Sequence, residues 1–599
     1  MSDNFITQSS TSSNPQSPAP DETQSSAPSK SQSLTPNERI IPFAPNTPAH
    51  SGKKPVVLLI LDGWGLAPAD AGNAVTLANT PHMDRLWNEY PHTQLGASGE
   101  HVGLPKGVDG NSETGHMNIG AGRVVWQSLS RIDRSIEDGS FFQTLVFLEA
   151  IEHARKNNAK LHLIGLVSPG LVHSSVQHLI ALLHLAEQQQ FDNVFVHAFT
   201  DGRDAPPTAS LPVLQAVEQE MQRLNVGKLA SITGRFYAMD RDHNWERTQQ
   251  AFEVLTVGKG VTTTDWQKAL RDSYEQKDTD EFVKPIVILG PDGRPTIIED
   301  HDAVIFFNFR VDRPRQLTWA FVLPDFETRN LTGSSSNQFV KAPSATTDQS
   351  DQLTSQSANQ ALPINFRRVK VPQNLYFATM SDYDKDLTNP KAFANEDISD
   401  NLGQVLSKSG VRQLRLTETE KEKMVTYYID GKEEEPFPGE HWLIVPSKKV
   451  KTYAEAPEMS AVEITDELVR EIGSDGFDVA IVNLVNGDMV GHTGDIQAGV
   501  KACEVVDQQV GRIVEAILQT EGVLLITADH GNVEEMINRQ TGKIDTKHST
   551  APVPLIVVGK EFTGKQIELP TGKLADLAPT VLKLMHLSQP AKMTGESLI

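Results

Sequence analysis

Pro55-Val-Val-Leu-Leu-Ile-Leu61 is an unbroken run of apolar residues, and Asp62-Gly63-Trp64-Gly65 follows it directly. Such a run is typical of a strand that is buried on both faces of a parallel sheet. An acidic residue at the carboxyl end of a buried strand stands where α/β proteins place their ligands, although a simple Asx turn would also explain Asp62. We therefore expect an α/β fold with functional side chains just beyond its strands.

The same alternation of apolar runs and helical spacing continues along the chain, as in proteins built on parallel sheets. Further strands are predicted at 161–167, 192–199, 229–234, 303–307, 375–380, 411–416, 478–484, 522–528 and 554–558. Helices are predicted at 79–90, 144–156, 175–188, 397–410, 459–472 and 500–518.

Length and composition limit what the chain can be. At 599 residues it is long enough for two or more domains. The formal net charge of −23 argues against non-specific binding to nucleic acid or to anionic membranes, because both need a basic face. The single cysteine, Cys503, excludes an intramolecular disulfide, and the apolar runs are too short for a transmembrane helix. We expect a monomeric cytoplasmic protein with a small-molecule partner.

Two segments are poor in apolar residues and rich in Ser, Thr, Gln, Pro or Asn. Residues 1–52 are predicted to be a disordered N-terminal extension, because they cannot bury enough surface to offset the entropy of ordering. They lack the apolar core of a signal peptide and match a transit peptide poorly. Residues 331–360 are predicted to be a disordered insertion in a surface loop.

A serine lies among glycines and small polar residues in Gly110-Asn-Ser112-Glu-Thr-Gly-His-Met-Asn-Ile-Gly-Ala-Gly-Arg123. The pattern indicates a loop that runs into the start of a helix. Unpaired backbone N–H groups and the helix dipole favour negative charge there, including a phosphate. Taken alone, the stretch favours the simpler interpretation of Ser112 as a helix-capping serine.

Arginines recur at the carboxyl ends of the predicted strands in the middle of the chain. The guanidinium group suits phosphate and carboxylate, so their shared placement predicts an anion-binding pocket. These arginines are Arg203, Arg235, Arg241, Arg310 and Arg313.

Metal-ligand side chains recur at the strand ends of the two outer parts of the chain. Three carboxylates and three imidazoles are too many for one closed zinc site, and they suit two divalent ions of the Mn²⁺ or Zn²⁺ kind. Ser112 then becomes a candidate nucleophile held by a metal. The candidate ligands are Asp62, Asp488, His492, Asp529, His530 and His548.

Beyond these patterns, the chain from Lys54 to Ile599, without the insertion, resembles the cofactor-independent phosphoglycerate mutases of the alkaline-phosphatase-like superfamily. The motifs that carry the resemblance are Leu61-Asp-Gly-Trp-Gly65, Gly110-Asn-Ser-Glu-Thr-Gly-His116, Asp201-Gly-Arg-Asp204, Gly234-Arg-Phe-Tyr-Ala-Met-Asp-Arg241, Glu418-Thr-Glu-Lys421, Asn486-Gly-Asp-Met-Val-Gly-His492 and Thr527-Ala-Asp-His-Gly-Asn532.

The resemblance implies an alkaline-phosphatase-like domain formed by residues 53–126 and 396–599, with an α/β transferase domain, residues 127–395, inserted into it. It also implies interconversion of 3-phosphoglycerate and 2-phosphoglycerate in glycolysis and gluconeogenesis, through a phosphoserine at Ser112 and without 2,3-bisphosphoglycerate. The alternatives are a metal-dependent phosphohydrolase, another phosphomutase of the superfamily, or a non-catalytic binding protein.

The resemblance assigns roles to individual residues. One metal would be bound by Asp488, His492 and His548, and the other by Asp62, Ser112, Asp529 and His530. Mn²⁺ is the expected ion, and Zn²⁺ and Co²⁺ are alternatives because ligand sets overlap. Ser112, Asp204, His173 and Lys421 would be catalytic, with Asp204 transferring protons. The substrate would be held by His173, Arg203, Asp204, Arg235, Arg241, Arg310, Arg313 and Lys421.

Four positions depart from the family pattern. Pro169 and Leu171 replace residues of the usual Ser-Asp-Gly-Gly sequence, Ser175 replaces a histidine, and a second usual histidine is missing near Met424. These departures affect the expected substrate pocket and leave every expected metal ligand in place.

Overall fold

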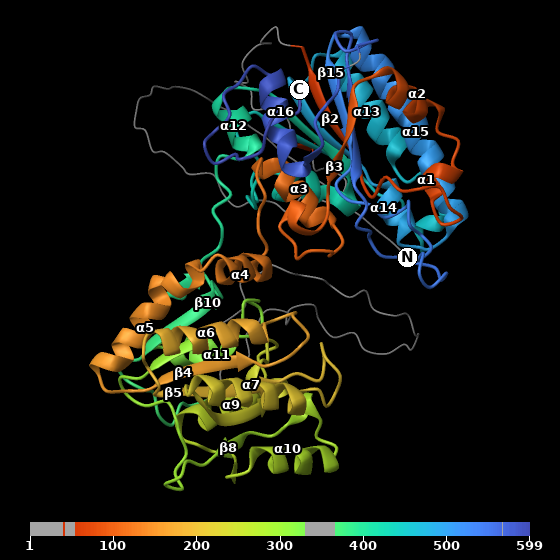
Figure 1. The fold of residues 1–599 in the computed structure, drawn as a ribbon. Coiled ribbons are helices and arrows are strands. Elements are labelled where there is room, and N and C mark those ends of the chain that lie inside the picture. The colour runs from red at the N-terminus through yellow and green to blue at the C-terminus, as the bar shows by residue number, and fades with distance from the viewer. Residues whose placement is uncertain (1–39, 42–53, 330–365, 566) are drawn as a thin grey trace, which may run out of the picture.

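Two β-sheets organise the computed structural model of this chain, one in each half of the molecule (Figure 1). The structure describes residues 40–41, 54–329, 366–565 and 567–599. The first half contains the first sheet, whose strands come from both ends of the chain, and the second half contains a sheet made from its middle. Residues 122–127 and 394–401 connect the two halves.

The first sheet has the order β1-β13-β12-β14-β2-β15-β16-β3-β17. Its five strands from β13 to β15 are parallel, whereas β16 runs antiparallel to both of its neighbours. The strand bounds are β1 Ile40–Ile41, β2 Val56–Leu61, β3 His92–Gly96, β12 Gln413–Glu418, β13 Glu440–Val445, β14 Val479–Leu484, β15 Val523–Thr527, β16 Val553–Val558 and β17 Gly572–Lys573.

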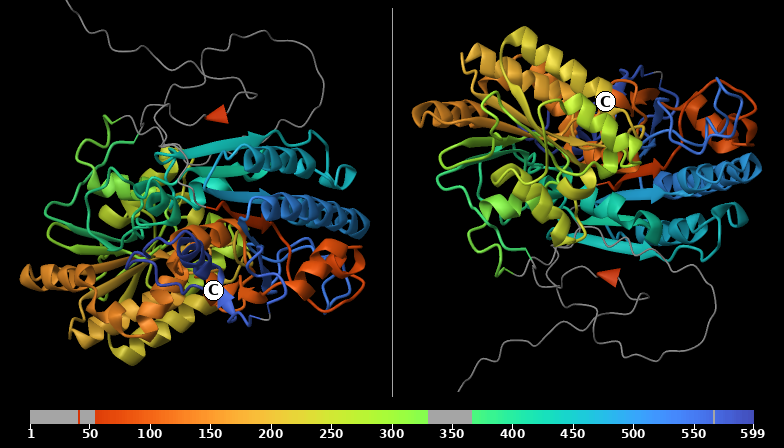
Figure 2. Two further views of the ribbon diagram at one scale, coloured as in Figure 1. Left: turned by 90° about the horizontal axis from the view of Figure 1, so that it is seen from above. Right: turned by 90° about the horizontal axis from the view of Figure 1, so that it is seen from below.

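Helices cover both faces of this sheet (Figures 1 and 2). One layer consists of α1 Ala74–Leu77, α2 Pro81–Glu89, α13 Ala461–Gly473, α14 Asn486–Gly491 and α15 Ile496–Gln519. The other consists of α3 Ser112–Ala121, α12 Leu402–Lys408 and α16 Leu577–Leu584.

The second sheet has the order β11-β10-β9-β4-β5-β6-β8-β7, and it is parallel from β11 to β6. The strand bounds are β4 Leu161–Leu166, β5 Val194–Thr200, β6 Lys228–Gly234, β7 Val261–Thr263, β8 Ile286–Ile288, β9 Ala303–Phe306, β10 Tyr376–Ser381 and β11 Lys391–Phe393. The helices of this half are α4 Ser128–Glu137, α5 Leu145–Lys156, α6 Val176–Gln188, α7 Ser210–Leu224, α8 Arg235–Ala238, α9 Trp245–Thr256, α10 Trp266–Glu275 and α11 Arg315–Val322.

Strand β4, in which His162 is the one polar residue, is buried on both of its faces. Leu161 and Leu163 pack into the core on the side of α5, α6 and α7, whereas Ile164 and Leu166 pack into the core on the side of α9 and α11. Both faces of the strand are therefore buried, as its mostly apolar sequence predicts.

The α/β prediction is confirmed, and the predicted strands and helices are present with shifted ends. The largest differences are α12, which is shorter than 397–410, and α15, which extends beyond 500–518 at both ends. Asn401 and Asp495 cap these two helices by accepting from the backbone N–H three residues ahead, which sets where each begins.

Two residues of the range 1–52, which is predicted to be disordered, are described by the structure. Ile40 and Ile41 form β1, which pairs antiparallel with Trp442 and Leu443 on the edge strand β13. The other residues of that range, and the predicted insertion at 331–360, lie outside the described residues. Among the residues that are described, no helix is long and apolar enough to cross a membrane.

A chain of four polar side chains crosses the second sheet within its core. Ser231 Oγ lies 2.8 Å from His197 Nδ1, His197 Nε2 lies 2.9 Å from His162 Nδ1, and His162 Nε2 lies 3.1 Å from Asp302 Oδ2. The ionised Asp302 can only accept, so each imidazole donates through Nε2 and accepts through Nδ1. Burial lowers the pKa of both histidines, so both imidazoles are neutral near pH 7.

Acid should therefore destabilise the second half. A histidine whose folded pKa lies below that of the unfolded chain contributes stability above about pH 6.5 and loses it as the pH falls, by up to about 1.4 kcal/mol per pH unit. Calorimetry from pH 7.5 to pH 5 should show a smaller fall in melting temperature for the double variant His162→Leu/His197→Leu than for the wild type. Equal falls would contradict a neutral histidine pair.

Candidate metal centre and anion-binding pocket

Four neighbouring strands of the first sheet end at one place. In the order β12-β14-β2-β15 they are parallel, so their carboxyl ends share one edge. Lys421 follows β12, Asp488 follows β14, Asp62 follows β2 and Asp529 follows β15. Fold topology thus gathers one lysine and three carboxylates from distant parts of the sequence.

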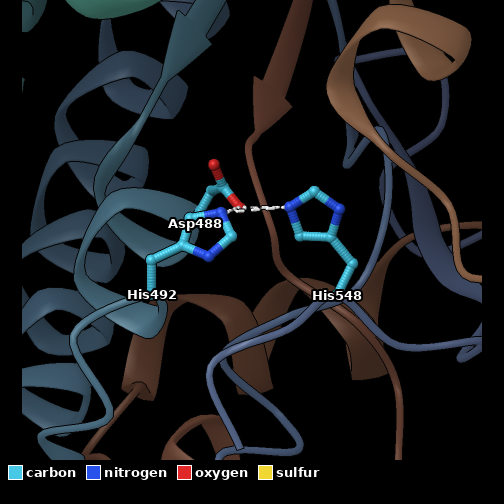
Figure 3. A group of neighbouring side chains, drawn as sticks. All are labelled: Asp488, His492 and His548. Atoms are coloured by element: carbon cyan, nitrogen blue, oxygen red, sulfur yellow. Dashed lines mark hydrogen bonds and ion pairs between the residues drawn. The ribbon is translucent and has the colours of Figure 1, made fainter. Parts of the chain in front are cut away.

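Asp488, His492 and His548 form the first cluster, which we call the histidine group (Figure 3). Asp488 Oδ1 lies 3.2 Å from His492 Nε2 and 3.1 Å from His548 Nε2, and the two Nε2 atoms are 3.1 Å apart. Asp488 lies in the short helix α14, and its carbonyl accepts from His492 N at 3.0 Å. One helical turn therefore carries both Asp488 and His492.

Hydrogen bonds at the outer nitrogens determine which nitrogen of each neutral imidazole carries the proton. His492 Nδ1 lies 2.8 Å from the carbonyl of Thr546, and His548 Nδ1 lies 2.8 Å from the carbonyl of Gly110. A carbonyl only accepts, so in a neutral imidazole Nδ1 carries the proton and Nε2 keeps its lone pair. Two lone pairs and a carboxylate oxygen then converge, an arrangement that suits a cation.

Asp62, Asp529 and His530 form the second cluster, the serine group, and each is fully buried. Ser112 Oγ lies 2.9 Å from His530 Nε2 and 3.4 Å from Asp62 Oδ1. The interpretation of Ser112 as a helix cap is wrong, because Asn111 is the N-cap of α3 and accepts from Thr114 N. Ser112 is the first residue inside the helix, so its hydroxyl is available to the cluster.

Gly115 explains why α3 can lie so close to this cluster. A Cβ atom at that position would lie 2.5 Å from the carbonyl oxygen of Asp529 and 2.9 Å from its Cβ. Any larger residue would push α3, and Ser112 with it, away from the strand end.

Lys421 bridges the two groups and the serine. Its Nζ lies 2.6 Å from Ser112 Oγ, 2.9 Å from Asp62 Oδ1 and 2.7 Å from Asp488 Oδ2. Burial opposes the charge of Lys421, but the carboxylates of Asp62, Asp488 and Asp529 outweigh it and raise the pKa of the ammonium. Lys421 therefore stays protonated and donates to Ser112.

The charge balance of the two groups suits metal ions. Asp62, Asp488 and Asp529 are at most 2% exposed, and among the described residues Lys421 is the one lysine that contacts Asp62 and Asp488. Burial opposes protonation of His530, yet Asp529 and the other carboxylates raise the pKa of this imidazole to about 10. Among the described residues, none makes a hydrogen bond of good geometry to the buried Asp529 Oδ2, although His116 Nδ1 lies 3.2 Å away. A nitrogen-and-oxygen ligand set with surplus negative charge fits divalent Mn²⁺ or Zn²⁺.

The arginine pocket lies at the strand ends of the second sheet and is centred on the buried Arg235. Its Nη1 lies 2.6 Å from Asp201 Oδ1 and 2.6 Å from Asp204 Oδ2, and its Nη2 lies 3.0 Å from His173 Nε2. Burial and the neighbouring Arg235 lower the pKa of His173 to about 4. His173 is therefore neutral near pH 7, with Nε2 accepting from Arg235 and the proton on Nδ1, a buried atom without a hydrogen-bond partner.

The remaining arginines lie around this centre. Asp312 bridges Arg241 and Arg310, at 2.7 Å from Arg241 Nη1 and 3.1 Å from Arg310 Nε. Arg313 donates to the carbonyl of Met239 at 3.1 Å. Burial, then the positive charges of Arg235, Arg241 and Arg203, lower the pKa of Arg313, so several guanidinium groups are close enough to repel one another.

The departures noted in the sequence have local structural consequences. Leu171 adopts a left-handed backbone conformation with φ of 51°, which is unfavourable for a leucine, and its side chain is 51% exposed. Ser175 caps α6 by accepting from Gln177 N at 3.2 Å. Met424, three residues after Lys421, begins the π-helix η5, Met424–Tyr428.

Sequence reasoning missed the residues that hold the others in place. Asp201 and Asp312 support the arginines, whereas Asn532 donates to Asp488 Oδ1 at 2.8 Å and Asn483 donates to Asp62 Oδ2 at 2.8 Å. Asn483 left a usable signal, because it is the one polar residue in the apolar run of β14. Asp201 and Asp312 could not be singled out from the sequence, because the chain contains many other acidic residues.

Comparisons place this geometry among known proteins. A family model described as the metalloenzyme superfamily matches residues 54–589. The 2,3-bisphosphoglycerate-independent phosphoglycerate mutase 1 of Methanosarcina acetivorans is 46% identical over 549 residues, 91% of this chain and 99% of that protein. The 2,3-bisphosphoglycerate-independent phosphoglycerate mutase of Chloroflexus aggregans is 47% identical over 550 residues, 91% of this chain and 98% of that protein. A crystal structure of Leishmania mexicana phosphoglycerate mutase at low cobalt concentration is 28% identical, covers 93% of this chain and 99% of that one, and has a TM-score of 0.52.

The two groups should bind metal separately. After loading with Mn²⁺ and removal of free ion, mass spectrometry of the metal content should find about two ions per chain. His548→Ala and Asp529→Asn should each retain about one ion, because each removes a ligand from a different group. His184→Ala, which removes a histidine of the second half, should retain both. Unchanged metal content in both ligand variants would contradict this assignment.

Proposed function

We propose that this chain, which belongs to the 2,3-bisphosphoglycerate-independent phosphoglycerate mutases of the metalloenzyme superfamily, passes the phosphoryl group of its substrate through Ser112. It interconverts 3-phosphoglycerate and 2-phosphoglycerate, and it is a metal-dependent enzyme. The observation that carries the proposal is the position of Ser112 Oγ, 2.6 Å from Lys421 Nζ and 2.9 Å from His530 Nε2. Monomeric state and cytoplasmic location remain predictions.

The ligands divide between two ions in this proposal. Asp488, His492 and His548 hold one, and Asp62, Asp529 and His530 hold the other together with Ser112. When bound, the ions supply positive charge that stabilises the serine alkoxide and the phosphate oxygens. Mn²⁺ suits the mixture of carboxylate and imidazole ligands, and Zn²⁺ or Co²⁺ would fit the same donors.

Ser112 acts as the nucleophile. Its Oγ forms a bond to phosphorus as the bond from phosphorus to the glycerate oxygen breaks, and that oxygen takes up a proton. The reverse transfer, to the other glycerate oxygen, completes the isomerisation and returns a proton to Ser112. Lys421 supports both steps as a charged donor to Oγ, from which its Nζ lies 2.6 Å away.

The arginine pocket holds the glycerate while the phosphoryl group is on Ser112. Arg203, Arg235, Arg241, Arg310 and Arg313 supply charge for the carboxylate and phosphate, and the free Nδ1–H of His173 supplies a further donor. Asp204 is the proposed proton carrier. Its carboxylate is held by Arg235 but is 23% exposed, so a bound glycerate hydroxyl can reach it.

We also propose that residues 53–126 with 396–599, and residues 127–395, are separate domains that close over the substrate. The two sheets and the separate cores at each support this division. Helix α3, with Ser112 at its start, lies at the end of the first half that faces the second half (Figure 1). Closure would exclude water and strengthen the contacts between charges.

A metal-dependent phosphohydrolase is the competing function, since it would use the same metal groups and Ser112. The arginine pocket favours the mutase, because a hydrolase releases its product and has no need to retain a glycerate. A non-catalytic protein is disfavoured by the intact serine and ligand sets.

Replacement of the nucleophile gives the direct test. Ser112→Ala should retain less than about one thousandth of the mutase activity, because no phosphoenzyme can form. The wild type should interconvert the two phosphoglycerates without added 2,3-bisphosphoglycerate. Brief incubation with ³²P-labelled phosphoglycerate, followed by peptide mapping, should locate the label on Ser112, and label on another residue would contradict the proposal.

Weakening the arginine pocket should change the fate of the phosphoserine. Arg310→Ala removes a charged contact worth about 1.5–3 kcal/mol, so the glycerate should escape about tenfold or more faster. Water then competes for the phosphoryl group, and the ratio of released phosphate to isomerised product should rise. Arg271→Ala, on the exposed surface of α10, is the control and should leave that ratio unchanged.

A further inference from the structure

Two buried side chains that have no assigned role lie behind the serine group. His116 is in α3, one helical turn after Ser112, and Asn483 is in β14, between the strands that precede Asp62 and Lys421. Both are fully buried, and no contact with the substrate is needed from either.

The orientation of the Asn483 amide follows from its neighbour. Its Nδ2 lies 2.8 Å from Asp62 Oδ2 and 2.9 Å from His116 Nε2. Reversing the amide would bring its oxygen against the carboxylate of Asp62, so the NH₂ group must face both partners. The two N–H bonds of Asn483 are then used, one for each.

This orientation determines the tautomer of His116. Because Nε2 accepts from Asn483, the proton of the neutral imidazole is on Nδ1. Nδ1 lies 2.9 Å from the carbonyl oxygen of Ser112 and 3.2 Å from Asp529 Oδ2. The imidazole therefore lies between the backbone of the nucleophile and one carboxylate, and reaches the other carboxylate through Asn483.

We propose that His116 and Asn483 are positioning residues that hold Asp62, Asp529 and the Ser112 backbone in the relative geometry needed to bind the ion of the serine group. Asn483 turns Asp62 so that Oδ1, which lies 2.9 Å from Lys421 Nζ, faces Ser112. His116 fixes the start of α3 against Asp529. The inference rests on the proposed metal role of the serine group.

A purely structural role would give a different pattern. Asn118, two residues further along α3, is also fully buried, and its side chain bonds only to backbone groups of Val102, Thr114 and Val125 in the contacts that the structure describes. It thus provides a matched position in the helix that holds His116, where an Asn→Asp substitution touches no metal ligand.

The test compares Asn483→Asp with Asn118→Asp in the full chain, by titration of the metal-free protein with Mn²⁺. Asn483→Asp replaces a donor by a second carboxylate facing Asp62. It should weaken binding at the serine group about 10–100-fold, as loss of a supporting contact does in other metal sites, and leave the histidine group unchanged. High Mn²⁺ concentration should restore much of its activity. Asn118→Asp should lower the melting temperature and leave both affinities unchanged.

His116→Leu provides the second variant should Asn483→Asp fail to fold, and it should also weaken only the serine group. Unchanged affinity at the serine group in both the His116 and the Asn483 variants, or an equal loss at both groups, would overturn the inference. A wild type that binds a single ion at the histidine group would instead overturn the proposed function itself, so the two failures are distinguishable.

Discussion

The concentration of buried negative charge beside Ser112 is the constraint on which the rest of the structure depends. Asp62, Asp488 and Asp529 converge because parallel strands place their carboxyl ends at one edge. Uncompensated carboxylates in a protein interior are strongly unfavourable, so this edge is stable only with bound positive charge. Lys421 supplies part of this positive charge. The carboxylates also raise the pKa of His530, which shows that they favour further positive charge nearby. The same preference makes the site suited to divalent cations and to a phosphorylated serine.

In the second sheet, positively charged side chains lie at the carboxyl ends of parallel strands, where the first sheet has carboxylates. Guanidinium groups at the ends of its strands repel one another, which the lowered pKa of Arg313 reflects. Asp201 and Asp312 hold them together, but Asp312 is shared by Arg241 and Arg310 and leaves both partly exposed. An anionic substrate can relieve this repulsion. In the proposed mechanism, a phosphoryl group would meet cations on both sides, from metal ions in the first half and from arginines in the second.

The sequence predicted these two charged edges because each depends on a local pattern, an apolar strand followed by a polar residue. The carboxylates of the two metal groups could be named in this way, since Asp62, Asp488 and Asp529 come within four residues of the ends of buried strands. The contacts that join distant segments left no such pattern. Neither the approach of Lys421 to Ser112 nor the bond from Asn483 to Asp62 follows from spacing, because the strand order β12-β14-β2-β15 is not sequential. Pairing of Ile40 and Ile41 with β13 was missed for the same reason.

The departures at the arginine pocket show how the fold accommodates change beside a fixed site. Ser175 stands at the N-cap of α6, where a serine satisfies a free backbone N–H, so the position has a structural use independent of the substrate. Leu171 is different, because its left-handed backbone is unfavourable and its exposed side chain gains no burial. Gly170, next to it, packs so closely on Asp204 that an added Cβ would lie 2.6 Å from the Asp204 carbonyl oxygen. The unfavourable backbone of Leu171 therefore lies next to the residue that packs against Asp204, the proposed proton carrier. The conformation of this loop is in this way coupled to the position of Asp204 in the pocket.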